Sequence, residues 1–403
     1  SILHEGQLHA EKGSEWAITI PQPGKDTDPL NLHPALTAII GRLEAVTDRR
    51  IPVSELYEML RHDYGVRDGL IPILLLTVFI VHETEIAIYE DNVFQPEVEE
   101  NLMMRLARRW ETFEFQLCRI TGVRKALISQ LASVVEADSA ESSQLLAIVR
   151  PLYLFIAGLP YYARNTDQLS AETIALRKAI GAAREPADLV FNAIPEAMNL
   201  AVKGKAELDP KKLAARLSES ISELRRCFPE LQARMSTAIR EAFNFDGSLD
   251  DFRQSISGSA ETVIVGVGDP DFRAFCLKLM DAENAEPEWL ESFGSLLTRC
   301  PPSRWKDRDE LVFRERIHAM AGQFNRVLAT CFDRTGALPE TAVRLAVTPR
   351  SGLEKNIVVN LNSEQSQESA RLLAELRKHL PKNDQISLAT LSRLIWDIIP
   401  KEK

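Results

Sequence analysis

The chain has 403 residues, 45% of them hydrophobic and 26% charged, a balance typical of a folded protein rather than a disordered one. Its formal net charge of −10 disfavours a protein that wraps nucleic acid through its overall charge. The length exceeds that of one ordinary core, so two or three domains are expected.

The first 35 residues are interpreted as a leader segment from a preceding domain. The start, "SILHEGQLHAEKGSEW", does not begin with Met and lacks the basic and apolar regions of a signal peptide. A strand leading into a loop is predicted in "EWAITIPQPG". The chain is therefore expected to be part of a longer protein.

The cysteines are odd in number, far apart and form no CxxC pair, which argues against a disulfide framework or a zinc site. We expect reduced, mostly buried thiols in a cytoplasmic protein. The five positions are Cys118, Cys227, Cys276, Cys300 and Cys331.

A winged-helix-like module is predicted for residues 36–135. Helices are expected in "HPALTAIIGRLEAV" and "PVSELYEMLRH", the second with Ser54 as its cap. The apolar run "GLIPILLLTVFIV" follows, but it has only 12 residues from Leu70 to Val81, and a membrane span needs about 20. It is predicted to be a helix buried on all sides, with Pro72 near its start. No membrane partner is expected.

The second half of this module is predicted to be a hairpin, a helix and a strand. "TEIAIYEDNVFQPEV" indicates a hairpin that turns at Glu90, Asp91 and Asn92. A helix is expected in "VEENLMMRLARRW". In "TFEFQLCRI", apolar residues alternate with Glu114 and Gln116, which indicates a half-buried strand.

Winged helices often place a helix in the DNA major groove. From residue 38 to 125, however, 11 Lys and Arg stand against 15 Asp and Glu, a net charge of −4. A local cluster of cations remains. It is interpreted first as a solvated helix face and second as a phosphate-contacting surface. Its members are Arg105, Arg108, Arg109, Arg119, Arg124 and Lys125.

Residues 136–250 are predicted to form a helical domain. Ser170 is expected to cap one helix, and Asp209 and Pro210 to begin a long one. Pro229 is predicted to kink or break that long helix. The polar stretch "NFDGSLDDFRQSISGSAE" is expected to separate this domain from the next.

An α+β domain is predicted for residues 251–403. "ETVIVGVGDPDFRAFCLKLM" indicates a short strand-like run, then a helix with Asp269 as cap and Pro270 as first residue. Two further helices follow, then two strands around "PRSG". Asn362 or Ser363 is expected to cap the next helix, and "LATLSRLIWDII" to close the chain. The fold class is therefore mainly α with small β elements.

The sequence carries no recognised catalytic or cofactor motif. "VGVGDP" has Asp271 where a dinucleotide-binding loop needs a third glycine, and Gly24-Lys25 is followed by an aspartate where a Walker A loop needs Ser or Thr. "HETE" lacks the second histidine of a zinc motif, and no GxSxG occurs. No catalytic, cofactor-binding or metal-binding residue is predicted, and no cofactor is expected. An independent enzyme with a site assembled from distant residues stays an alternative.

Three stretches resemble the C-terminal region of large bacterial anti-phage defence P-loop ATPases of the BREX type and their relatives. They are "YGVRDGLIPILLLTVFIVHETEIAIYEDNVFQPEV", "AREPADLVF" and "DPDFRAFCLKLM…WLESFGSLLTRCPPSRWKDRDELVF", and they span roughly residues 36–325. The resemblance implies an ATPase module outside this chain and a role in sensing, assembly or nucleic-acid engagement. It carries over no catalytic residue. The leading hypothesis is a non-catalytic scaffold that binds protein partners or copies of itself, and direct DNA binding is the alternative.

Overall fold

The computed structural model divides into two compact units, residues 1–227 and 228–403. It is mainly helical with small antiparallel sheets, which confirms the predicted fold class. The finer boundaries expected at residues 35, 135 and 250 stay predictions. The structure describes residues 2–12, 15–46, 49–120, 124–135, 144–200, 208–265, 267–281, 283–331, 343–347, 355–359, 363–381 and 383–398.

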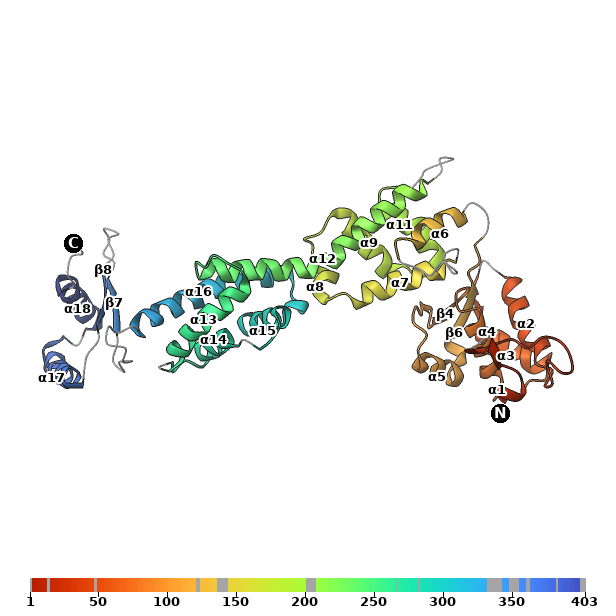
Figure 1. Cartoon of the computed structure of the whole chain (residues 1–403), viewed down its shortest axis with the longest axis horizontal. Helices are drawn as coiled ribbons and strands as arrows, with labels where there is room; N and C mark the ends of the chain where they lie inside the picture. The colour runs from red at the N-terminus through yellow and green to blue at the C-terminus, as the bar shows by residue number, and fades with distance from the viewer. Residues whose placement is uncertain are drawn as a thin grey trace. The chain divides into compact units, whose positions relative to one another are not determined.

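The first half of the first unit contains helices around a four-stranded sheet (Figure 1). Its elements are α1 (Ile2–Glu5), β1 (His9–Lys12), β2 (Glu15–Ile18), α2 (His33–Glu44), β3 (Ile51–Pro52), α3 (Val53–His62), α4 (Ile71–Val81), β4 (Ile86–Glu90), β5 (Val93–Phe94), α5 (Glu100–Arg108), the 3-10 turn η1 (Trp110–Thr112) and β6 (Phe113–Leu117).

The sheet is antiparallel, with strand order β3-β6-β4-β5. Along the chain, α2 immediately precedes β3, α3 and α4 separate β3 from β4, and β6 returns between β3 and β4. This is the order of a winged helix, with β5 and α5 inserted between its last two strands. The strand predicted in "EWAITIPQPG" is β2, which pairs with β1.

Helix α4 is the apolar run that dominates the sequence. Pro72 lies in its first turn, where its missing N–H leaves no hydrogen bond unmade. Most of its side chains are buried, but Ile80 and Val81 are 42% and 38% exposed. The prediction of burial on all sides is therefore wrong at the C-terminal end, because these residues lie where α4 leaves the core.

The hairpin turn is as predicted. Asp91 and Asn92 have φ of +50° and +66°, the positive values of a two-residue type I′ turn, which Asp and Asn tolerate better than most residues. Strand β4 is buried on both faces, which its alternating sequence does not reveal. Ile86 and Ile88 pack in the core of the winged-helix part, whereas Ala87 and Tyr89 pack in the core of the helices that follow.

Helix α3 begins earlier than predicted. Its cap position is Pro52 and no side chain caps it, so the expected cap, Ser54, lies inside the helix. The reason is tertiary: β3 pairs with β6 through Ile51 and Pro52, and the chain passes directly from that strand into the helix.

The second half of the first unit is helical. It contains α6 (Arg124–Ala132), α7 (Leu146–Gly158), α8 (Tyr161–Asn165), α9 (Ala171–Ala182), α10 (Pro186–Asp188), the π-helical turn η2 (Leu189–Ala193), α11 (Ile194–Ala197) and the start of α12 (Pro210–Ala242). The Ser170 side chain accepts a hydrogen bond from the Thr173 N–H, as predicted for its cap. Asp209 accepts one from the Lys211 N–H at 3.0 Å and begins α12.

Helix α12 continues through Pro229, so the predicted break is absent. A proline inside a helix removes one hydrogen bond and costs about 3 kcal/mol. Burial along the helix offsets this cost, since Leu224, Cys227, Leu231 and Met235 are nearly or fully buried on both sides of the proline.

The second unit contains the end of α12 and the elements that follow it in the chain. They are α13 (Leu249–Ile264), α14 (Pro270–Met280), α15 (Glu286–Thr298), the 3-10 turn η3 (Pro302–Arg304), α16 (Asp307–Cys331), β7 (Val343–Val347), β8 (Lys355–Val359), α17 (Ser363–His379) and α18 (Asp384–Ile398). Strands β7 and β8 form the predicted antiparallel pair. Residues 348–354 and Asn362 lie outside the described residues.

Most of the polar stretch expected to separate two domains is helix α13. Ser248 and Asp251 form a reciprocal capping box at its start. Phe252, Ala260 and Val263 are buried at helical spacing, so a narrow apolar stripe suffices to dock a mostly polar helix. The strand-like run before Gly268 is helical through Ile264, where α13 ends.

Local signals elsewhere in the second unit act as predicted. The Asp269 side chain accepts hydrogen bonds from the N–H groups of Asp271 and Phe272, and Pro270 is the first residue of α14. Trp305 is fully buried at the corner before α16. Its Nε1–H donates to the Cys300 carbonyl at 2.8 Å.

Candidate functional site

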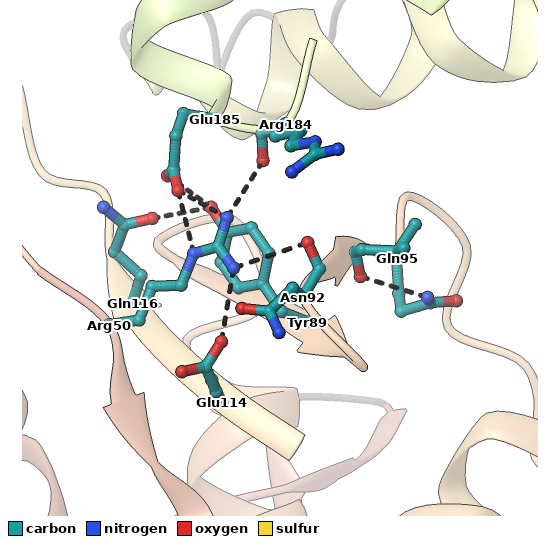
Figure 2. Close-up of polar contacts among 9 residues, drawn as sticks. Arg50, Tyr89, Asn92, Gln95, Glu114, Gln116, Arg184 and Glu185 are labelled. Atoms are coloured by element: carbon teal, nitrogen blue, oxygen red, sulfur yellow. Dashed lines mark hydrogen bonds and ion pairs between the residues drawn. The ribbon is translucent and has the colours of Figure 1, made fainter. Parts of the chain in front are cut away.

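One face of the sheet carries polar and aromatic side chains. Tyr89 of β4 lies opposite Glu114 of β6, and Ala87 lies opposite Gln116. Cross-strand partners share a face, so Tyr89, Glu114 and Gln116 lie on the side opposite the buried phenylalanines of β6. Arg50, one residue before β3, reaches the same side (Figure 2).

Arg50 connects this face to the loop before α10. Its Nε donates to Glu185 Oε1 at 2.8 Å, and its Nη2 pairs with the same carboxylate. Its Nη1 lies 3.2 Å from Glu114 Oε2. The guanidinium carbon stands 3.7 Å from the centroid of the Tyr89 ring, in cation–π contact. Arg50 therefore contacts a residue, Glu185, that lies 135 positions further along the chain.

Backbone carbonyls complete the surroundings of Arg50. Its Nη1 and Nη2 each lie 3.4 Å from a carbonyl oxygen, that of Asn92 in the hairpin turn and that of Arg184 (Figure 2). Burial lowers the pKa of Arg50, but hydrogen bonds to Glu185 and Glu114 outweigh this effect, and the net shift is upward. The guanidinium therefore stays charged.

Tyr89 is fully buried beneath Arg50. Its hydroxyl oxygen lies 2.6 Å from Gln116 Oε1 and 3.0 Å from Glu185 Oε2, and with one hydrogen it donates to one of them at a time. Burial raises its pKa far above the ordinary value. Burial also raises the pKa of the nearby Cys118 thiol to about 12. Both groups are therefore protonated at neutral pH, and the contacts of Arg50 and Tyr89 tie two parts of the fold together.

A cleft of about 790 Å³ opens beside this cluster. Its charged lining comes from separate parts of the chain: Arg49, Arg50, Arg124, Arg184, Glu185 and Asp188.

One wall of the cleft is aromatic. The Arg124 guanidinium lies 4.6 Å from the centroid of the Phe191 ring, which limits the positions it takes. Asn92, Gln116 and Asn192 add amide groups to the lining. The cleft is thus polar and arginine-rich within a chain of net negative charge.

Two of the cations predicted to contact nucleic acid are paired within the fold. Arg105 contacts Glu90 through Nε and Nη2, both at 2.9 Å. Arg119 contacts Glu85 at 2.9 Å and also pairs with Glu44. Glu85 immediately precedes β4 and Glu90 ends it, so the two arginines contact carboxylates at opposite ends of the strand.

The other four cations lie elsewhere. Arg108 and Arg109 are exposed at the end of α5, and Lys125 is exposed on α6. Arg124 lines the cleft. The six residues are therefore distributed over the hairpin end, the strand end and α6. Their contact with nucleic acid stays a prediction.

The cluster around Arg50 escapes local sequence reasoning. Arg50 and Glu185 have no motif and no short spacing, and only the fold joins them. The single local signal is in β6, where Glu114 and Gln116 show that one face of the strand tolerates polar groups.

In the described part of the chain, no group of three or more His, Cys, Asp or Glu side chains is arranged to hold a metal ion. Among the described helices, none combines the length and the apolar character that crossing a bilayer requires. The cysteines, all five of them described, are free thiols. No family model matches the sequence, and neither a curated protein nor a solved structure matches it.

Proposed function

We propose that this chain is a non-catalytic interaction and assembly region of a bacterial anti-phage defence ATPase in the cytoplasm. The defence context rests on the sequence resemblance over residues 36–325. The interaction role rests on one structural observation, the uncovered apolar side chains of the last two helices.

Helices α17 and α18 expose large apolar residues along much of their length. The exposed fractions are 54% for Leu372, 52% for Leu373, 45% for Leu376, 54% for Ile386, 63% for Leu388, 48% for Leu394 and 69% for Ile398. Single exposed leucines are ordinary, but a run of them on adjacent helices is typical of a surface that another protein covers.

The pattern within α17 supports a docking face. Leu372, Leu373 and Leu376 are spaced so that they share one side of the helix. Glu368, Arg371 and the basic last turn provide both signs of charge beside them, which is the composition of an interface with an apolar centre and a polar rim. The proposed partner is a second copy of this chain or a protein encoded beside it.

Light scattering on the full chain, alone and with the product of the neighbouring gene, tests this proposal. Leu372→Lys/Leu388→Lys is expected to abolish assembly. Gln367→Lys adds the same charge at an exposed polar position of α17 and is expected to assemble like the unmodified chain. A strictly monomeric chain that binds no neighbouring product, or assembly that survives the leucine substitutions, contradicts the proposal.

DNA binding is the second candidate. It is favoured by Arg108 and Arg109, which are exposed and, among the described residues, form no ion pair with a carboxylate. Fluorescence anisotropy with duplex DNA should then show affinity that falls steeply with salt and is lost in Arg108→Ala/Arg109→Ala. An absence of binding at low salt removes this candidate.

A further inference from the structure

The arginine-lined cleft has an excess of positive charge that the fold leaves in place. Its lining holds four arginines against two carboxylates, so it carries a net charge of +2. Arg50 holds Glu185, and Asp188 accepts a hydrogen bond from the neutral Asn192 amide at 2.8 Å. Among the described residues, Arg49, Arg124 and Arg184 form no ion pair with a carboxylate, although the chain as a whole carries ten more negative than positive charges.

These three arginines come from three separate elements and line one cleft. Arg49 precedes β3, Arg124 begins α6, and Arg184 follows α9. Cations on separate elements repel one another when gathered in one place, so retaining them there costs stability. Arg50 in the floor supports the arrangement, because it contacts the carbonyl of Arg184 and fixes the loop that bears it.

The ligand chemistry follows from the guanidinium groups. A guanidinium presents parallel N–H donors that match two oxygens of a phosphate, and it stays charged at any physiological pH. Three such groups lining one cleft favour a ligand with more than one phosphate. The amides of Asn92, Gln116 and Asn192 can donate to or accept from further polar atoms. A volume of about 790 Å³ lies within the range of small-molecule sites.

We propose that this cleft binds a small ligand carrying two or more phosphates, of about the size of a nucleotide. Arg49, Arg124 and Arg184 contact the phosphates, and the Arg50–Glu185 pair holds the floor in place. The Phe191 ring holds the Arg124 guanidinium in position through their cation–π contact. The site lies in the first unit and does not depend on the proposed assembly surface of α17 and α18.

Isothermal titration of the full chain with sodium tripolyphosphate and with ADP tests the inference. Tripolyphosphate binding alone assigns the site to inorganic polyphosphate, and tighter ADP binding assigns it to a nucleotide. Arg49→Ala/Arg184→Ala is expected to weaken binding at least tenfold for the better probe. Arg184→Lys keeps the positive charge but lacks the paired N–H donors of a guanidinium, so affinity is expected to fall by less than in the double alanine variant.

The matched control is Arg108→Ala/Arg109→Ala, which removes two exposed arginines of the same unit outside the cleft. It is expected to bind both probes like the unmodified chain, and circular dichroism melts confirm that each variant is folded. The inference is overturned if neither probe binds, if the cleft variant binds normally, or if the control loses binding equally. It is also overturned if single-stranded DNA binds more tightly than either probe and displaces it, because the cleft then belongs to a nucleic-acid surface.

Discussion

Replacing Arg50 with Met tests whether the tie between the sheet and the helices stabilises the first unit. Met keeps much of the aliphatic stem but removes the charge that faces Glu185, Glu114 and the Tyr89 ring. The variant leaves two carboxylates beside a buried tyrosine with no cation between them.

The expected magnitude follows from the exposure of the partners. The Arg50 side chain is 15% exposed, but Glu185 is 39% and Glu114 is 26% exposed, so water solvates both carboxylates when the arginine is gone. The full 3–5 kcal/mol for breaking a buried pair therefore does not apply. Arg50→Met removes charged hydrogen bonds and a cation–π contact at partly exposed sites. Its free energy of unfolding is therefore expected to fall by about 2–3 kcal/mol.

Hydrogen exchange of the β4 amides under increasing urea measures this loss, because it reports the opening of the first unit peptide by peptide. The matched control is Arg61→Met, whose arginine forms one ion pair among the described residues, with Asp68 at 3.7 Å, and both side chains are more than half exposed. It is expected to change stability by less than about 0.5 kcal/mol.

A double substitution with Glu185→Gln should cost less than the sum of the single changes, since both remove one interaction. If Arg50→Met and Arg61→Met lower the opening free energy equally, the reasoning about the tie is refuted.

Two further predictions concern the second unit. Gly294→Ala should destabilise it by about 1–3 kcal/mol, because the new methyl would clash with Cγ of Pro302. Gly258→Ala on α13 places a methyl that meets nothing within 4 Å and should stabilise the unit by about 0.5–1 kcal/mol. Urea midpoints of the two variants that move in the same direction contradict this prediction. A hydrogen bond from Lys278 lowers the pKa of Asp281 to about 2, so its contribution is complete above pH ~4 and is lost as the pH falls toward 2. Asp281→Asn should flatten the dependence of the urea midpoint on pH in that window and lower stability at pH 7, and an unchanged slope contradicts the assignment.

Local chemistry was readable from the sequence where a feature depends on neighbours along the chain. Ser170 and Asp269 cap helices because their side chains reach the N–H groups two or three residues on. Asp91 and Asn92 adopt the positive φ that a two-residue hairpin turn requires. Helix α4 follows from an apolar run too short to span a membrane and too apolar to be exposed.

The predictions that were wrong concern helices whose limits depend on contacts with residues distant in the sequence. Pairing of β3 with β6 moves the start of α3 ahead of Ser54. Burial against neighbouring helices carries α12 through Pro229 and orders a polar stretch as α13, so that packing outweighs local preference.

The distinction between local and long-range interactions also separates what could be predicted of the fold from what could be predicted of the site. Short-range hydrogen bonds and periodic apolar spacing determined most helices, the hairpin and the mainly α fold class. The Arg50 cluster and the arginine-lined cleft were decided by the tertiary structure alone, because Arg50 meets Glu185 across 135 positions and the cleft gathers its arginines from three elements. No pattern within a short window of sequence specifies which distant charge a guanidinium will contact; only packing of the sheet against the helices does.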